Sequence, residues 1–430
     1  MMSGLNPEAE TDLEHDDSWA IDPPALADGR YHVMFVDDEV NVLSGLSRML
    51  RWIRDSWEMT FVSSGAEALE VLEHRPVDAI VSDMKMPIMN GAELLAQVQA
   101  RYPSTARLVL SGEADPDTVL DVVRSAQQFL AKPCDAPTLT SAINRALSVQ
   151  RSLSDPALRA LIGGVSALPT LPAVYDQLVT AVSSPDVDMS EVAAIVSSDV
   201  ATSAELLKIV NSAFFGPPRQ VYSVNDAVRL LGLDNVQALV LTSSLFHVNE
   251  ALTWVLNVEE LRIQSLRRAS IAREIARLEE WTTRAKDIAV LSCLLRDVGL
   301  LVLTEGRPEA TVELLASIEA EPEPPSPTRL NELEISAYGC SIPQASACLL
   351  GLWGCTPAIV HTIAVQPLSV ARPGVSKFER VLSFTTARAG GSMEHTVPLA
   401  DDYMTADRAL AWNEAADEAI GREGAPLPTS

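Results

Sequence analysis

Basic residues are scarce in this chain of 430 residues, which has 32 Lys and Arg against 58 Asp and Glu and a formal net charge of -26. A protein that binds the phosphate backbone of a nucleic acid needs clustered Lys and Arg. The charge balance therefore argues against nucleic-acid binding. The nearest basic segment, residues 262–277, contains five arginines, and we interpret it as a solvated or partner-facing helix rather than a DNA-reading one.

Long apolar runs and a secretion signal are also absent from the sequence. No uninterrupted apolar run reaches the ~18 residues that a membrane-spanning helix needs, and the best candidate, residues 290–303, is interrupted by Arg296-Asp297. Residues 1–29 hold eight acids and no Lys or Arg, so they lack the basic start of a signal peptide. We expect them to form a disordered acidic leader, and we expect no membrane association.

Cysteine is rare, with five in the chain and no CxxC pair. The odd number and the missing pairs argue against a disulfide framework. Cys340, Cys348 and Cys355 lie near one another in the sequence, but their spacing suits buried small residues on helices better than a metal cluster. We therefore predict core thiols in a reducing cytoplasm.

The length and the 47% content of hydrophobic residues predict two or three folded domains. In residues 30–150, short β-rich runs alternate with amphipathic segments such as the one containing Leu43, Leu46 and Leu50. Alternation of this spacing is typical of a doubly wound α/β domain, here a five-stranded parallel, flavodoxin-like sheet. The predicted strands are 33–36, 59–63, 79–82, 108–110 and 128–131.

Five reactive side chains stand at the ends of these predicted strands. Asp37 and Asp38 follow the first strand, and Asp83 closes the third. Ser111 follows the fourth strand, and Lys132 follows the fifth. Because a doubly wound sheet binds its ligand beyond the carboxyl ends of its strands, we expect these five residues to meet in one site.

The chemistry of these side chains predicts a phosphorylation site. Carboxylate oxygens of Asp37, Asp38 and Asp83 are the hard ligands that Mg²⁺ prefers. Asp83 is the predicted nucleophile, which would become an acyl phosphate, while Ser111 and Lys132 would contact phosphoryl oxygens. Taken singly, each residue could be an ordinary turn acid, turn hydroxyl or solvated lysine, but their joint order at strand ends favours the site.

Residues 30–150 resemble the receiver domain of two-component response regulators. By that resemblance, Lys132-Pro133 is a cis peptide, and Phe129 is a switch aromatic that turns inward when Ser111 moves toward the phosphoryl group. Phe129 as a plain core residue remains the alternative. Asn90 departs from the Asp that the family often has before its Gly. The matching strings are Val36-Asp37-Asp38, Asp83-Met84-Lys85-Met86-Pro87 with Gly91, Ser111-Gly112 and Lys132-Pro133.

The resemblance also implies partners for the first domain. A histidine kinase or a phosphotransfer protein would donate the phosphoryl group to Asp83. The face formed by helices 116–126 and 138–149 would be the relay surface, or the surface of a possible homodimer.

Helical periodicity dominates the rest of the chain and predicts an all-α domain over residues 166–420. We expect a linker at 151–165, an exposed proline-rich loop at 321–328 and a tail at 421–430. Three strings resemble the HDOD domain, the HD-related output domain that is similar in fold to HD phosphohydrolases. They are Leu168-Pro169-Thr170-Leu171-Pro172, Asn211-Ser212-Ala213-Phe214-Phe215-Gly216 and Ala227-Val228-Arg229-Leu230-Leu231-Gly232.

The metal-binding histidines of an HD hydrolase are missing from this chain. Gln264-Ser265, Arg296-Asp297, Ile342 and Val365-Gln366 stand where that resemblance would place them. A single acid beside an arginine is a poor site for a catalytic metal. We therefore predict a non-catalytic output that acts by protein–protein interaction with an unknown downstream partner; the alternative is a cyclic-dinucleotide phosphodiesterase of the HD type.

Overall fold

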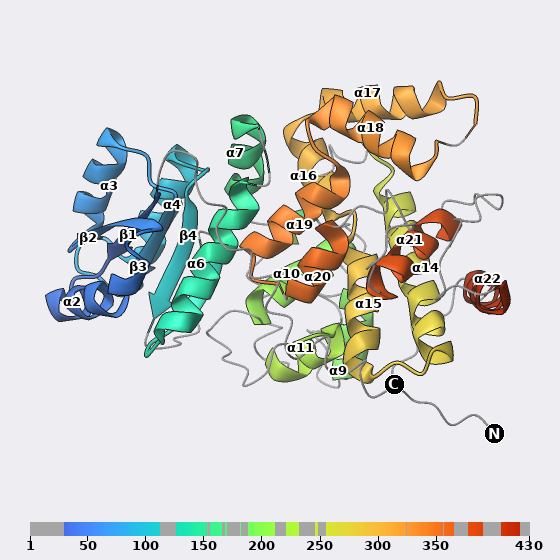
Figure 1. The fold of residues 1–430 in the computed structure, drawn as a ribbon, viewed down its shortest axis with the longest axis horizontal. Helices are drawn as coiled ribbons and strands as arrows, with labels where there is room; N and C mark the ends of the chain where they lie inside the picture. Colours follow the sequence, from blue (N-terminus) through green and yellow to red (C-terminus); the bar gives the residue numbers. More distant parts are fainter. Residues whose placement is uncertain are drawn as a thin grey trace.

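The structure is a computed structural model, and it divides into an α/β domain and a larger helical domain (Figure 1). The predicted leader, the segments 112–125, 170–172 and 211–216, and nearly all of the tail lie outside the described residues. Those residues are 30–111, 126–151, 153, 155–165, 168–169, 181, 188–210, 221–231, 246–247, 255–323, 325–355, 357–364, 377–389 and 406–421.

The α/β domain contains the predicted five-stranded parallel sheet, with strand order β2-β1-β3-β4-β5. Every residue of β1 and β3 is buried, because these strands are central and helices cover both faces of the sheet. The strands are β1 (Tyr31–Val36), β2 (Trp57–Val62), β3 (Ala79–Asp83), β4 (Ala106–Ser111) and β5 (Gln128–Ala131).

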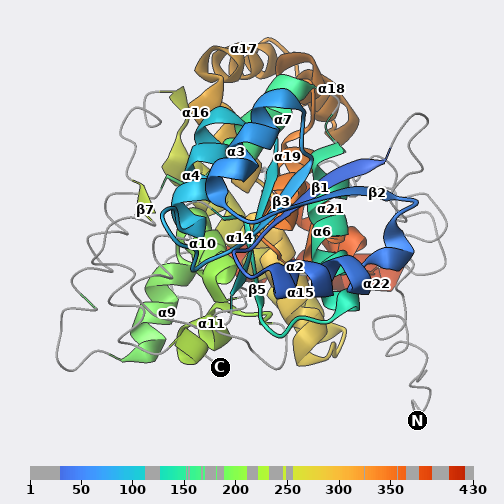
Figure 2. The same cartoon turned by 90° about the vertical axis from the view of Figure 1, so that its left-hand side faces the viewer.

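Helices α3 (Gly65–His74) and α4 (Gly91–Arg101) cover one face of the sheet. Helices α2 (Val40–Met49), with the short η3 (Arg51–Ile53) behind it, and α6 (Ala136–Arg151) cover the other (Figures 1 and 2). This placement completes the doubly wound fold and leaves the carboxyl ends of the strands at one edge.

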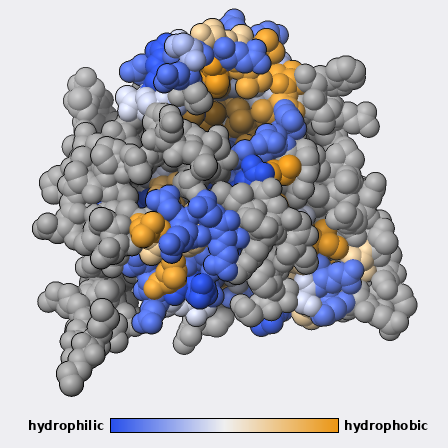
Figure 3. Space-filling view, turned by 90° about the vertical axis from the view of Figure 1, so that its right-hand side faces the viewer, coloured by the Kyte–Doolittle hydropathy of each residue, from blue (hydrophilic) through white to orange (hydrophobic). Residues whose placement is uncertain are grey.

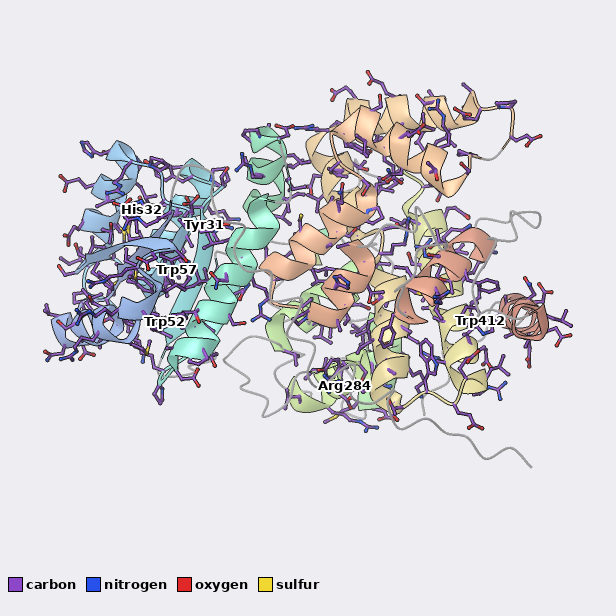
Figure 4. All side chains as sticks on the ribbon, viewed as in Figure 1. Tyr31, His32, Trp52, Trp57, Arg284 and Trp412 are labelled. Carbon is purple, nitrogen blue, oxygen red and sulfur yellow. The ribbon has the colours of Figure 1, made fainter. Side chains whose placement is uncertain are left out.

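The helical domain is built around α14, which packs against α15, α21 and α22. Trp412 of α22 points toward this core (Figure 4), where its Nε1 donates to Glu279 Oε1 at 2.8 Å and its ring meets Phe384 edge-on. Two short parallel strands, β6 (Leu168–Pro169) and β7 (Phe246–His247), accompany the helices. The helices are α9 (Met189–Ser197), α10 (Val200–Val210), α11 (Val224–Leu231), α14 (Val258–Leu278), α15 (Thr283–Leu295), α16 (Val298–Gly306), α17 (Pro308–Glu319), α18 (Pro327–Tyr338), α19 (Ile342–Leu352), α20 (Pro357–Ala364), α21 (Lys377–Ala389) and α22 (Ala406–Gly421).

Two segments differ from the sequence-based expectation. The loop predicted at 321–328 ends early, because Pro327 opens α18 with Ser326 as its cap. Proline suits the first position of a helix, where its missing N–H would have no partner. The linker predicted at 151–165 contains helix α7 (Pro156–Gly164), which is capped by Asp155.

Helix α7 is attached firmly to the α/β domain through its C-terminus. The carbonyl oxygen of Gly163 accepts hydrogen bonds from Arg107 Nη2 at 2.8 Å and from Gln127 Nε2 at 3.0 Å. The carbonyl oxygen of Gly164 accepts one from Gln99 Nε2 at 2.8 Å. These donors satisfy carbonyls that a helix end leaves free, and the guanidinium of Arg107 also complements the negative end of the helix dipole.

The same helix is attached to the helical domain. Leu161 packs so closely on Gly306 that a Cβ at that glycine would lie 2.2 Å from its Cδ1. Arg307 pairs with Asp155 at 2.8 Å. Elsewhere along the junction α6 packs on α19. Helix α7 is therefore a shared element of both domains rather than a free linker.

Cysteine burial follows the sequence analysis in the described part of the chain. All five cysteines are free, and Cys293, Cys340, Cys348 and Cys355 are buried, which confirms core thiols. No helix there is both long enough and apolar enough to cross a membrane. The apolar segment 290–303 divides into α15 and α16 at Arg296-Asp297.

The close contact at the end of α7 predicts opposite results for two neighbouring glycines. An alanine at Gly163 would place its Cβ 2.3 Å from the carbonyl oxygen of Pro103, whereas one at Gly164 would lie 3.6 Å from Pro103 Cβ. We expect Gly163→Ala to lower the free energy of unfolding by about 1–3 kcal/mol through overpacking. Gly164→Ala should leave it unchanged or raise it, because alanine favours helix. Urea unfolding of both variants measures this, and equal effects would contradict the close contact.

Candidate functional site

Three of the predicted site residues meet at the carboxyl edge of the sheet. Asp37 follows β1, Asp83 ends β3, and Lys132 follows β5. Lys132 Nζ donates to Asp37 Oδ2 at 2.7 Å and makes an even shorter contact with Asp83 Oδ1. One ammonium group therefore lies between two carboxylates that would otherwise repel each other.

Backbone donors fix the orientation of both carboxylates. The Glu39 N–H donates to Asp37 Oδ1 at 2.9 Å, and the Lys85 N–H donates to Asp83 Oδ2 at 2.8 Å. Each carboxylate thus has one oxygen held by the backbone and one oxygen on Lys132. Both acids are buried, with Asp37 3% and Asp83 9% exposed, so these contacts replace water.

The electrostatics of the site favour a charged lysine. Burial alone would lower the pKa of Lys132, but its hydrogen bonds to Asp37 and Asp83 outweigh burial and raise the pKa above its usual value. The raised pKa keeps the ammonium group charged throughout the neutral range. The site as a whole still has two carboxylates for one cation and is therefore net negative.

Position 91 must be a glycine, because it lies against the backbone of Asp83. A Cβ at Gly91 would lie 2.2 Å from the Asp83 carbonyl oxygen, and the Gly91 N–H donates to Met84 O at 2.9 Å. Asn90 caps α4 and forms a capping box with Glu93. Because Asn and Asp are equivalent in this capping role, the departure at Asn90 leaves the start of α4 intact.

For Ser111 and Phe129 the structure describes the backbone only. Ser111 ends β4 opposite Ala131 of β5, so its backbone lies at the same sheet edge, while the side chains of Ser111 and Phe129 lie outside what the structure describes. The Lys132-Pro133 peptide is cis, which confirms that prediction. Asp38 is exposed.

The charge and donor chemistry of the site fit a magnesium ion. Mg²⁺ is commonly held by one or two carboxylates together with water and phosphate oxygens, and Asp37 and Asp83 provide two. Among the described residues, no group of three His, Cys, Asp or Glu side chains gathers closely enough to hold a metal. The role of Asp38 as a third ligand therefore stays a prediction.

A second cluster of charges is buried in the helical domain, around Arg296-Asp297. Arg268 Nη2 of α14 donates to Asp297 Oδ2 at 2.5 Å, and Arg296 donates to the other carboxylate oxygen. Arg268, Arg296 and Asp297 are 5%, 8% and 6% exposed. Burial would raise the pKa of Asp297, but the two arginines lower it. Two guanidinium groups therefore occupy the surroundings of the one remaining acid.

Glu334 of α18 adjoins this cluster. Its Oε2 accepts the backbone N–H of Ile342 at 2.9 Å, and burial raises its pKa to about 7. Ser265 Oγ accepts from Arg268 at 3.0 Å, and Gln264 donates to Glu260 instead. The positions of Val365-Gln366 lie outside the described residues. In the described part of the cluster, an arginine therefore occupies each oxygen of Asp297, and a backbone N–H holds Glu334.

Sequence reasoning missed the role of Arg268. We expected the arginines of 262–277 to be solvated or partner-facing, but Arg268 is buried against Asp297. A buried guanidinium needs an acidic partner, and that partner lies in the turn between α15 and α16. No local signal in the sequence announces the pair, since its members are separated by 29 positions.

Comparisons with known proteins agree with this arrangement of domains. Residues 33–144 match the response regulator receiver domain family, and residues 168–367 match the HDOD domain family. The transcriptional regulatory protein GlrR of Escherichia coli (strain K12) is 33% identical over 132 residues, which cover 30% of this chain and 29% of GlrR. LuxO of Vibrio campbellii is 29% identical over 132 residues, with the same coverage. The chain thus spans less than a third of the length of these curated relatives.

Solved structures with similar chains include the signal receiver domain of an HD domain-containing protein from Pseudomonas fluorescens Pf-5. It is 30% identical, with a TM-score of 0.28, and the match covers 29% of this chain and 99% of that one. The MmoQ response regulator from Methylococcus capsulatus is 23% identical, with a TM-score of 0.46, and the match covers 59% of this chain and 98% of that one.

The parallel sheet with its acid pair and lysine, followed by a helical domain, defines a two-domain protein of the receiver type. More particularly, the chain contains a response regulator receiver domain at residues 33–144 and an HDOD domain at residues 168–367.

Removing the ammonium group between Asp37 and Asp83 should destabilise the receiver domain. Because the pKa of Lys132 is raised above 10.5, the wild-type contact is fully present at neutral pH and is lost only in strongly alkaline solution. Lys132→Met should lower the free energy of unfolding at pH 7 by about 1–3 kcal/mol, since two carboxylates are left facing each other. The loss should shrink on addition of Mg²⁺, which supplies the missing positive charge. A loss that is independent of Mg²⁺ would contradict the proposed electrostatics.

Replacing Asp297 or Asp287 by asparagine should change the free energy of unfolding in different ways. Asp297→Asn leaves two buried arginines without a carboxylate, and we expect a loss of about 3–5 kcal/mol in the free energy of unfolding. Asp287 is the matched control, because burial raises its pKa to about 6 and its charge opposes folding at pH 7. Asp287→Asn should therefore be neutral or stabilising at pH 7, with the difference vanishing toward pH 4. Chemical denaturation across this range measures both, and a mild Asp297→Asn would show that the pair is not structural.

Proposed function

We propose that this response regulator is phosphorylated on Asp83 by a histidine kinase or a phosphotransfer protein, in the cytoplasm. The observation that supports this most is the position of Lys132 Nζ on Asp83 Oδ1, while the Lys85 N–H holds Oδ2. Oδ1 is then the oxygen that faces an incoming phosphoryl group. Attack by Oδ1 would form the acyl phosphate, and the donor's imidazole would leave with the bonding electron pair.

The surrounding side chains would position and neutralise the phosphoryl group. Lys132 would move from Asp37 to one phosphoryl oxygen, and the Ser111 hydroxyl would donate to another. A bound Mg²⁺, held by Asp37, Asp38 and Asp83, would supply positive charge to the remaining oxygens. Two carboxylates for one lysine leave a net negative charge, which makes a divalent cation suitable here.

The signal would pass from the receiver to the helical domain through β5. Phe129 is the predicted switch residue, and its neighbour Gln128 donates to the carbonyl oxygen of Gly351 in α19 at 3.3 Å. If β5 shifts when Ser111 moves, the hydrogen bond from Gln128 would transmit the shift to α19. Helix α6, part of the predicted relay face, also packs on α19, so a homodimer through α6 would require the two domains to separate.

The output is proposed to be binding of a downstream protein rather than catalysis. Its support is the pairing of Asp297 with Arg268 and Arg296, which disfavours a metal ion at that acid and with it the alternative of a cyclic-dinucleotide phosphodiesterase. Figure 3 shows the face of the helical domain far from the receiver, where hydrophilic residues alternate with small apolar areas. The exposed apolar side chains of α17 and α18 include Val312, Leu315 and Ile335.

Phosphorylation and coupling can be tested in one experiment on the full chain. Incubation with a small phosphodonor and Mg²⁺ should add one phosphoryl group to the wild type and none to Asp83→Asn, as measured by intact-protein mass spectrometry. Hydrogen exchange of α19 should change on phosphorylation, because Gln128 contacts Gly351. Asp55→Asn, at an exposed acid of the same domain, is the control and should behave as the wild type.

The outcomes separate the two parts of the proposal. Phosphorylation of Asp83→Asn at the wild-type level would exclude Asp83 as the acceptor. Normal phosphorylation with unchanged exchange in α19 would leave the acceptor in place but refute the route through β5.

A further inference from the structure

A cavity of about 370 Å³ lies where α7 meets the α/β domain, at the edge of the sheet opposite Asp83. Its walls come from the α3–β3 loop, the end of α4, the α4–β4 loop, α6 and α7. Leu72, Val77 and Leu147 give it an apolar lining. The volume lies in the range that small-molecule sites occupy, and none of its residues takes part in the proposed phosphorylation.

Two of the charged groups around the cavity already have partners. Arg101 pairs with Glu73 at 2.6 Å and lies over the ring of Tyr102. Asp78 accepts the backbone N–H of His32 at 2.8 Å. These groups are held in place by the protein itself, so they shape the cavity more than they attract a ligand.

Arg159 of α7 is different. Its Nε is buried and has no hydrogen-bond partner among the described residues. No described acid forms an ion pair with it, although it lines the cavity. The residue as a whole is half-buried, and its two terminal nitrogens also have no hydrogen-bond partner among the described residues. The buried Nε is shielded from the cavity, so an anion there would be held by the terminal nitrogens.

We propose that this cavity binds a small monocarboxylate with an apolar body. The guanidinium of Arg159 can hold a carboxylate through two parallel hydrogen bonds, and the apolar lining would receive the rest of the molecule. The fixed carboxylate of Asp78 disfavours a doubly charged anion such as phosphate. A ligand bound there touches α7 and the receiver together, so it favours the joined arrangement of the two domains. This goes beyond the proposed phosphorylation and does not depend on it.

Isothermal titration of the full chain tests the proposal with benzoate, phenylacetate and hexanoate as probes. Benzyl alcohol is the uncharged match of benzoate, and inorganic phosphate is the doubly charged comparison. At least one of the carboxylates should bind the wild type, with benzyl alcohol and phosphate at least tenfold weaker.

Two variants separate the effect of the charge of Arg159 from the effect of the cavity volume. Arg159→Gln removes the charge, and Ala160→Phe fills the cavity while leaving Arg159 in place; each should weaken carboxylate binding at least tenfold. Arg329→Gln, which removes an exposed arginine of α18, is the control and should bind as the wild type. Circular dichroism confirms that each variant is folded.

Several results would overturn the proposal. It fails if none of the three carboxylates binds the wild type, or if Arg159→Gln binds as tightly as the wild type. Phosphate binding as tight as that of the best carboxylate would refute the monocarboxylate class. Because Asp83 phosphorylation is measured separately, these failures leave the proposed function untouched.

Discussion

The repulsion between two buried carboxylates, held at one edge of a parallel sheet, is the constraint on which the receiver domain depends. Parallel strands bring their carboxyl ends together, so the side chains of Asp37 and Asp83 lie close to each other. A cation must lie between them, and the ammonium group of Lys132 does so. Backbone N–H groups then hold the outer oxygens, and Gly91 lets α4 start directly against the chain at Asp83. The geometry of the site follows from this single electrostatic requirement.

The buried charge clusters of the two domains have net charges of opposite sign. The receiver has two acids and one cation, so it has an excess of negative charge that suits a divalent ion. The helical domain has one acid, Asp297, between Arg268 and Arg296, so its excess near that acid is positive. The ion pairs of Asp297 link α14 to the turn before α16.

The sequence predicted the sheet and the order of the site residues well, because periodicity and strand-end acids are local signals. The start of β4 was predicted at residue 108, because an arginine at position 107 is unusual in a buried strand. The strand in fact starts at Ala106. The guanidinium of Arg107 is buried because Gly163, far along the chain, offers a carbonyl oxygen. The same limitation hid the Arg268–Asp297 pair and the structural role of α7. Partners that lie in distant elements leave no pattern within either element.

The attachment of α7 also bears on how such proteins are assembled in evolution. In this chain the contacts of the receiver continue past the end of α6 to Gly163 and Gly164 at the end of α7. A receiver transplanted from another protein would need donors equivalent to Gln99, Arg107 and Gln127 to hold the helix that follows it. Recombination that separates these residues from α7 would leave buried polar groups on both halves. The input and output domains of this chain are therefore expected to be inherited together.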